Sequence, residues 1–117
     1  MKALDGGTIL RDYECDGVAL VRGFLSPDEV GAIRAELDRY IREDLPDKPL
    51  DARTLEADEK TVRNLWRLEQ HNEFFRAFAE RADLRALIAP LVKGDPVLAG
   101  VETFNKPALI GSGVPPH

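Results

Sequence analysis

A helix start near residue 26 constrains this chain more than any other feature of its sequence. Ser26 can cap the helix with its hydroxyl, and Pro27 fits the first helical position, where its missing N–H breaks no hydrogen bond. Glu29 follows three residues after Ser26 and completes a capping box. Apolar side chains then recur at helical spacing, at Val30, Ile33, Leu37 and Ile41. The pattern predicts an amphipathic helix over residues 27–42.

Two further helices are predicted downstream. Asn72 can cap the first of them, which carries the apolar residues Phe74, Phe75, Phe78, Ala79 and Ala82. Asp83 can cap the second, which carries Leu84, Leu87, Ile88 and Leu91. We expect Pro90 to bend or end that helix and Gly94 to stop it.

Short apolar segments predict a few strands between these helices. Residues 18–21 are rich in β-branched side chains and bounded by glycines, residues 62–68 alternate, and residues 97–105 form a third candidate. Residues 1–16 are polar and irregular, and residues 43–60, with two prolines and many acids, predict a surface loop. The mixture predicts an α+β fold in which helices predominate.

Size, charge and cysteine content exclude several classes of function. A chain of 117 residues can build one core and one domain. Its formal charge of −5 comes from 21 acidic and 16 basic residues, and no basic patch points to nucleic acid. Cys15, the single cysteine, cannot form an internal disulfide. The start of the chain does not have the pattern of a signal peptide, and no segment is long and apolar enough for a membrane span, so we expect a cytoplasmic protein with no membrane partner.

Three segments together resemble the phytanoyl-CoA dioxygenase family. DGVALVRGFLSPDEV, residues 16–30, is similar to the family's opening strand and first helix. Residues 84–95 are similar to the helix that ends in a glycine before the sheet. Phe104-Asn105-Lys106-Pro107, followed by GSGVPPH at 111–117, resembles the approach to the family's His-x-Asp metal motif. The resemblance spans residues 10–117.

The resemblance implies a double-stranded β-helix, or jelly-roll, oxygenase. Such enzymes hold iron(II) with two histidines and one carboxylate and use 2-oxoglutarate as co-substrate to hydroxylate a small organic molecule. His117 matches the first metal-ligand histidine. The family's second histidine, its metal-ligand aspartate and its arginine for 2-oxoglutarate have no counterpart here. We therefore expect residues 1–117 to be the N-terminal part of one oxygenase domain, an incomplete barrel that is inactive alone and active in the full-length parent.

The resemblance also brings Asn105 and Lys106 forward as candidate cofactor-binding residues. In similar proteins this stretch lines the active-site mouth, where these side chains can contact the co-substrate or an acidic group of the substrate. Ordinary solvation at the end of a strand explains them equally well. Arg63 and Arg67 are open to two interpretations, an anionic co-substrate or, as we favour, ion pairs with acids of the preceding loop. Trp66 and the three phenylalanines at 74, 75 and 78 are interpreted as core.

Two other classes of function compete with the oxygenase. The first is a small non-catalytic binding module whose unpaired strand edges pair with a partner chain or cause self-association. The second is a degenerate relative of the oxygenases that lacks the metal triad. Fold resemblance alone does not separate these classes, because function depends on the site.

Overall fold

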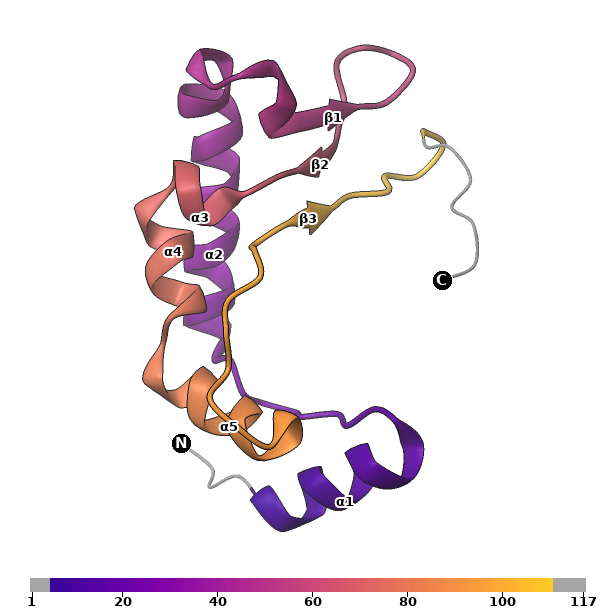
Figure 1. Ribbon diagram of the computed structural model, residues 1–117. Coiled ribbons are helices and arrows are strands. Elements are labelled where there is room, and N and C mark those ends of the chain that lie inside the picture. The colour runs from indigo at the N-terminus through magenta and orange to yellow at the C-terminus, as the bar shows by residue number, and fades with distance from the viewer. Residues whose placement is uncertain (1–4, 111–117) are drawn as a thin grey trace. The chain divides into compact units, whose positions relative to one another are not determined.

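The computed structural model describes residues 5–110. The chain divides into two compact units. The helices and strands of both units are labelled in Figure 1. Among the described residues, the helical unit comprises residues 5–38 and 80–98, and the sheet unit comprises residues 39–79 and 99–110. Helices together with a small antiparallel sheet confirm the α+β class. Within the described residues, no helix combines the length and apolar character needed to cross a membrane.

The helical unit begins with a helix that the sequence analysis did not predict. Helix α1 (Gly6–Asp16) starts where the Asp5 carboxylate accepts a hydrogen bond from the Thr8 N–H at 3.1 Å. It ends at Gly17, whose φ of 75° is left-handed and whose N–H donates to the Tyr13 carbonyl. The prediction of an irregular segment over residues 1–16 is therefore wrong for this part of the chain. Short polar residues favour helix caps, and Asp5 satisfies a donor that the helix leaves unpaired.

Residues 18–21, predicted as a strand, follow α1 without regular structure. Gly17 and Gly23 on either side both adopt positive φ, and no described residue pairs with the segment in a sheet. A β-branched run becomes a strand only where another strand supplies hydrogen-bonding partners. The prediction of a strand here is wrong for that reason.

The capping box at residue 26 is confirmed. The Glu29 N–H donates to Ser26 Oγ, and the Ser26 N–H donates to Glu29 Oε1, both at 3.1 Å. Helix α2 (Pro27–Arg39) continues directly into a π-helical turn, η1 (Tyr40–Asp44). The predicted end of the helix near residue 42 thus lies within that turn.

Helix α5 (Ala82–Val92) completes the helical unit and departs from prediction at both ends. Arg81 occupies the N-cap position, and Asp83 lies inside the first turn, so the prediction that Asp83 caps the helix is wrong. Pro90 lies within the helix, which ends shortly after it. Lys93, rather than Gly94, adopts the left-handed conformation at the C-terminus, with φ 55°.

The sheet unit has three short antiparallel strands in the order β1-β2-β3 (Figure 1). They are β1 (Arg53–Leu55), β2 (Val62–Leu65) and β3 (Thr103–Phe104), and Asn64 pairs with Thr54 on one side and Phe104 on the other. The strands predicted over 62–68 and 97–105 are therefore real but shorter. The predicted loop at 43–60 also contains η1 residues, two 3-10 turns, η2 (Leu45–Asp47) and η3 (Leu50–Ala52), and the strand β1.

Two helices and a buried core support this sheet. Helix α3 (Leu68–His71) precedes α4 (Glu73–Ala79), and the predicted cap is confirmed, because the Phe75 N–H donates to Asn72 Oδ1 at 2.9 Å. The buried apolar residues of the unit are Tyr40, Leu45, Ala52, Leu65, Leu68 and Phe75. Phe75 is thus core as predicted, whereas Phe74 is exposed. Trp66 is half-buried and donates from Nε1 to Thr54 Oγ1 at 2.8 Å.

Candidate functional site

Asn105 and Lys106 lie directly after β3, beside the start of β2. The Asn105 N–H donates to the Arg63 carbonyl at 2.7 Å, and its side-chain amide donates to the Val62 carbonyl at 3.4 Å. Asn105 therefore continues the pairing of β3 with β2, and its side chain is used for structure. Lys106 is exposed, and it forms no hydrogen bond or ion pair with the residues of the described range 5–110.

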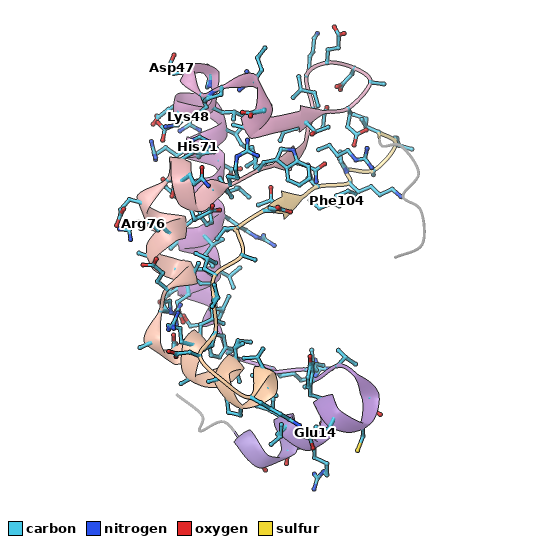
Figure 2. All side chains as sticks on the ribbon, in the orientation of Figure 1. Glu14, Asp47, Lys48, His71, Arg76 and Phe104 are labelled. Atoms are coloured by element: carbon cyan, nitrogen blue, oxygen red, sulfur yellow. The ribbon has the colours of Figure 1, made fainter. Side chains whose placement is uncertain are left out.

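The register of the sheet brings Arg63 to the same place. Its side chain is 25% exposed, and the guanidinium carbon lies 5.5 Å from the centre of the Phe104 ring. Phe104 is 52% exposed, so the ring forms a surface on which the guanidinium rests. Figure 2 shows Phe104 on β3. A cation over an aromatic face is attracted by the ring quadrupole, which holds the guanidinium in one orientation.

Glu56 is the carboxylate nearest to Arg63. Its side chain is 3% exposed, and its Oε1 lies 3.9 Å from Arg63 Nε. This distance allows attraction between the charges but exceeds the length of a hydrogen bond. Arg63 Nε is itself buried and has no hydrogen-bond partner.

A tight turn between β1 and β2 carries Glu56 to this position. The Asp58 carboxylate accepts hydrogen bonds from the N–H groups of Lys60 and Thr61 at 2.9 and 2.8 Å, and from the Thr61 hydroxyl. These bonds hold the pKa of Asp58 below its ordinary value. The Glu56 N–H in turn donates to the Thr61 carbonyl at 2.8 Å. The turn thus fixes the backbone on which Glu56 faces Arg63.

Arg67 has a structural role. Its guanidinium donates to the Asp51 carbonyl at 2.8 Å and pairs with the Asp51 carboxylate at 3.2 Å. Asp51 and Glu56 both belong to the loop that precedes β2. The interpretation that Arg63 and Arg67 pair with acids of this loop is therefore confirmed for both arginines.

The structure joins some of the predicted site residues and leaves others apart. Asn105 contacts Arg63 directly, and Lys106 is the next residue in the chain. His117 lies outside the described residues. His71 ends α3 (Figure 2), and its Nε2 atom is buried without a hydrogen-bond partner. Between residues 5 and 110, no three side chains of His, Cys, Asp or Glu gather as a metal ion requires.

Two contributors to this cluster were not predicted from the sequence. Phe104 was expected as a strand residue and as part of the family-like segment 104–107, with no role in a ligand site, and Glu56 belonged to an acidic loop with no role of its own. A signal for Glu56 existed, because a Thr three residues after Asp58 is typical of a side-chain-capped turn, which brings the residues flanking it together. No local pattern predicts that Phe104 meets Arg63, since the two are far apart in the chain.

Comparison with known proteins identifies the family. The family model of phytanoyl-CoA dioxygenase (PhyH) matches residues 13–117. The chain belongs to the phytanoyl-CoA dioxygenase family. No curated protein and no solved structure matched it. The phytanoyl-CoA dioxygenase match covers β1, β2, β3 and the cluster around Arg63, and it supports a dioxygenase-type domain.

Proposed function

We propose that this chain contributes its helices and its three-stranded sheet to an iron(II)/2-oxoglutarate-dependent dioxygenase domain of the jelly-roll type. The family match over residues 13–117 is the observation that carries the proposal. The proposed dioxygenase domain hydroxylates a small organic substrate. The antiparallel sheet is compatible with the jelly roll, because β1 and β3 each have one edge that no described strand occupies.

The proposed site assigns the metal and the co-substrate to different residues. We assign His117 as a metal ligand and Asn105 and Lys106 as residues that contact 2-oxoglutarate. Bound iron would supply the activation of dioxygen, with 2-oxoglutarate as the reductant. The described residues fit the co-substrate better than the metal, because Lys106 and Arg63 offer cationic groups near a sheet end while residues 5–110 hold no metal-ligand cluster.

Lys106 suits the binding of an anion. An exposed ammonium group with no partner among residues 5–110 is available to a carboxylate without breaking an existing ion pair. Asn105 suits a different task. Its side-chain NH2 group has two N–H donors, and one of them donates to the Val62 carbonyl, so the other is left to donate to a ligand carboxylate. Its main effect is to hold Lys106 beside β2.

Succinate formation from 2-oxoglutarate tests the proposal. The full-length parent supplied with iron(II), 2-oxoglutarate and dioxygen should form succinate, and His117→Ala in that protein should abolish the activity. Lys106→Met should raise the KM for 2-oxoglutarate about tenfold, consistent with the loss of one charged contact. Lys60→Met, an exposed lysine of the β1–β2 turn, is the matched control and should leave the KM unchanged. Absence of 2-oxoglutarate consumption in the iron-loaded full-length parent would contradict the proposal.

The free strand edges support a second candidate, a non-catalytic interaction module. Leu55 on β1 and Phe104 on β3 are exposed apolar residues. Each of these two strands pairs with β2 along one edge, and no described strand occupies its other edge. A partner strand could add to such an edge through backbone hydrogen bonds. A change in molecular mass with concentration, together with no succinate formation by the full-length parent, would favour this candidate over the oxygenase.

A further inference from the structure

We infer that Arg63 forms a carboxylate-binding site with Lys106, in which Phe104 and Glu56 hold the guanidinium ready for the ligand. The inference rests on the proposed function and deepens it, since it names the group that selects the anionic ligand of the site. It adds Arg63 to Asn105 and Lys106, the residues that the family resemblance indicates.

The hydrogen-bond donors of Arg63 are the first observation. An arginine side chain carries five N–H donors, and a largely buried arginine normally uses most of them. Arg63 is 25% exposed, yet its guanidinium donates no hydrogen bond to any residue between 5 and 110. Its one ion pair, with Glu56, is too long at 3.9 Å to be a hydrogen bond. Nε is buried beside Glu56, so the N–H groups of the two terminal nitrogens, Nη1 and Nη2, are the donors available to a ligand.

The fixed position of Arg63 is the second observation. The Phe104 ring supports one face of the guanidinium at 5.5 Å from its centre, and the Glu56 carboxylate lies beside Nε. The backbone of Arg63 is also held in place, because its carbonyl accepts a hydrogen bond from the N–H of Asn105, directly after β3, at 2.7 Å. A cation held in this way loses little conformational entropy when an anion binds, so its contacts favour affinity.

The surroundings select a carboxylate. The planar fork of an arginine matches the two oxygens of a carboxylate in a bidentate arrangement. Glu56 lies next to the same guanidinium and is almost fully buried, so a doubly charged phosphate would meet stronger repulsion than a singly charged carboxylate. Both 2-oxoglutarate and an acidic substrate carry such a group.

The NMR signal of the Arg63 side chain gives a direct test. Titration of the 15N-labelled chain with glutarate, a dicarboxylate that lacks the 2-oxo group, should shift the Arg63 Nε–H resonance. Arg63→Gln should weaken glutarate binding at least tenfold. Arg63→Lys keeps the charge beside Glu56 and preserves folding, but it should still weaken binding several-fold because the fork is lost.

Arg67→Gln is the matched control. Arg67 is a nearby arginine whose donors are used by Asp51, so its loss should leave glutarate affinity unchanged. The inference is overturned if glutarate leaves the Arg63 Nε–H signal unmoved. It is equally overturned if Arg63→Lys, with a wild-type fold by its 15N spectrum, binds glutarate as tightly as Arg67→Gln does.

Turnover separates the two sources of the carboxylate and isolates the inference from the proposed function. A tenfold rise in the KM for 2-oxoglutarate in Arg63→Lys, with kcat retained, identifies the co-substrate as the ligand. An unchanged KM in uncoupled 2-oxoglutarate decarboxylation, with glutarate binding lost, identifies an acidic substrate instead. Glutarate binding that depends on Arg63, in a full-length parent that never consumes 2-oxoglutarate, would support the carboxylate site and contradict the oxygenase.

Discussion

Each unit of the chain contains an arginine whose guanidinium lies over a phenylalanine ring, yet the two arginines are bonded differently. In the helical unit, Arg81 lies 5.9 Å from the Phe24 ring centre and is 28% exposed. In the sheet unit, Arg63 lies 5.5 Å from the Phe104 ring centre and is 25% exposed. Burial and aromatic contact are therefore nearly the same in both units.

The carboxylates around the two arginines make the difference. Arg81 donates to Glu29 at 2.6 Å and to both Asp83 oxygens at 3.0 and 2.5 Å. Glu29 also belongs to the capping box of α2, so Arg81 connects the starts of α2 and α5. Among the described residues, Arg63 has one carboxylate nearby, that of Glu56, and at 3.9 Å it is too far from Nε for a hydrogen bond. The comparison teaches that exposure alone does not distinguish a structural arginine from a binding one, whereas the use of its donors does.

The largest change in the free energy of unfolding is expected from the buried core of the sheet unit. Leu68 is fully buried, so Leu68→Ala should lower the free energy of unfolding by about 2–5 kcal/mol, through lost apolar burial and the cavity left behind. Leu20→Ala, at an exposed position of the helical unit, should change it by less than about 0.5 kcal/mol. Urea unfolding measures both, and equal effects would show that Leu68 is not core.

Helix caps give the next largest difference between the units. Asn72→Ala should cost about 2 kcal/mol, because it leaves a buried N–H at Phe75 without its acceptor. Ser26→Ala should cost about 1 kcal/mol, because water can replace the lost bond at an exposed cap. Amide hydrogen exchange in α4 and α2 follows each loss. A larger effect at Ser26 than at Asn72 would contradict this ranking.

Acid should lower the stability of the helical unit by protonating Glu29 and Asp83, the two carboxylates that accept hydrogen bonds from Arg81. Backbone bonding at Ser26 and the Arg81 guanidinium lower the pKa of Glu29 from its ordinary 4.5, and Arg81 lowers the pKa of Asp83 from 3.8. Their stabilisation is complete above these ordinary values and is lost as pH falls through the lowered values of the folded state. Glu29→Gln should therefore flatten the decline of stability below pH 4.5. A decline as steep as that of the unmutated chain would refute the assignment.

The smallest effects are expected at two left-handed residues, one in each unit. Lys93 has φ 55° and Glu59 has φ 60°, a conformation that glycine adopts without steric cost. Lys93→Gly and Glu59→Gly should each raise the free energy of unfolding by about 0.5 kcal/mol, after the greater entropy of glycine in the unfolded chain is subtracted. Thermal melts measure the gain, and alanine at the same positions should give none.

Local signals explain which parts of the fold could be predicted from the sequence. The start of α2 and the cap of α4 depend on residues within one helical turn, so Ser26, Glu29 and Asn72 were sufficient. The predicted strand at 18–21 was wrong because its hydrogen bonds depend on a partner that no local pattern reveals. Helix α1 was missed because its cap precedes two glycines, which have low helix propensity.

The candidate site was predictable only in part for a similar reason. The resemblance indicated Asn105 and Lys106 because a motif in the sequence carries them. The partnership of Arg63 with Phe104 depends on the register between β2 and β3, and that of Arg63 with Glu56 depends on the turn at Asp58. Whether the donors of Arg63 are used is a property of the folded chain, so two nearby arginines with similar sequence surroundings proved different in structure.

The attachment of residues 100–102 to helix α3 has a consequence for synthesis on the ribosome. The Val101 N–H donates to Glu69 at 2.8 Å, and the Leu68 N–H donates to the Val101 carbonyl at 2.9 Å. These bonds join positions more than thirty residues apart in the chain. A nascent chain grows at about 5–20 residues per second, so β1 and β2 leave the ribosome seconds before β3. During that interval the edge of β2 that β3 later occupies has no partner strand, so it can pair with strands of other chains.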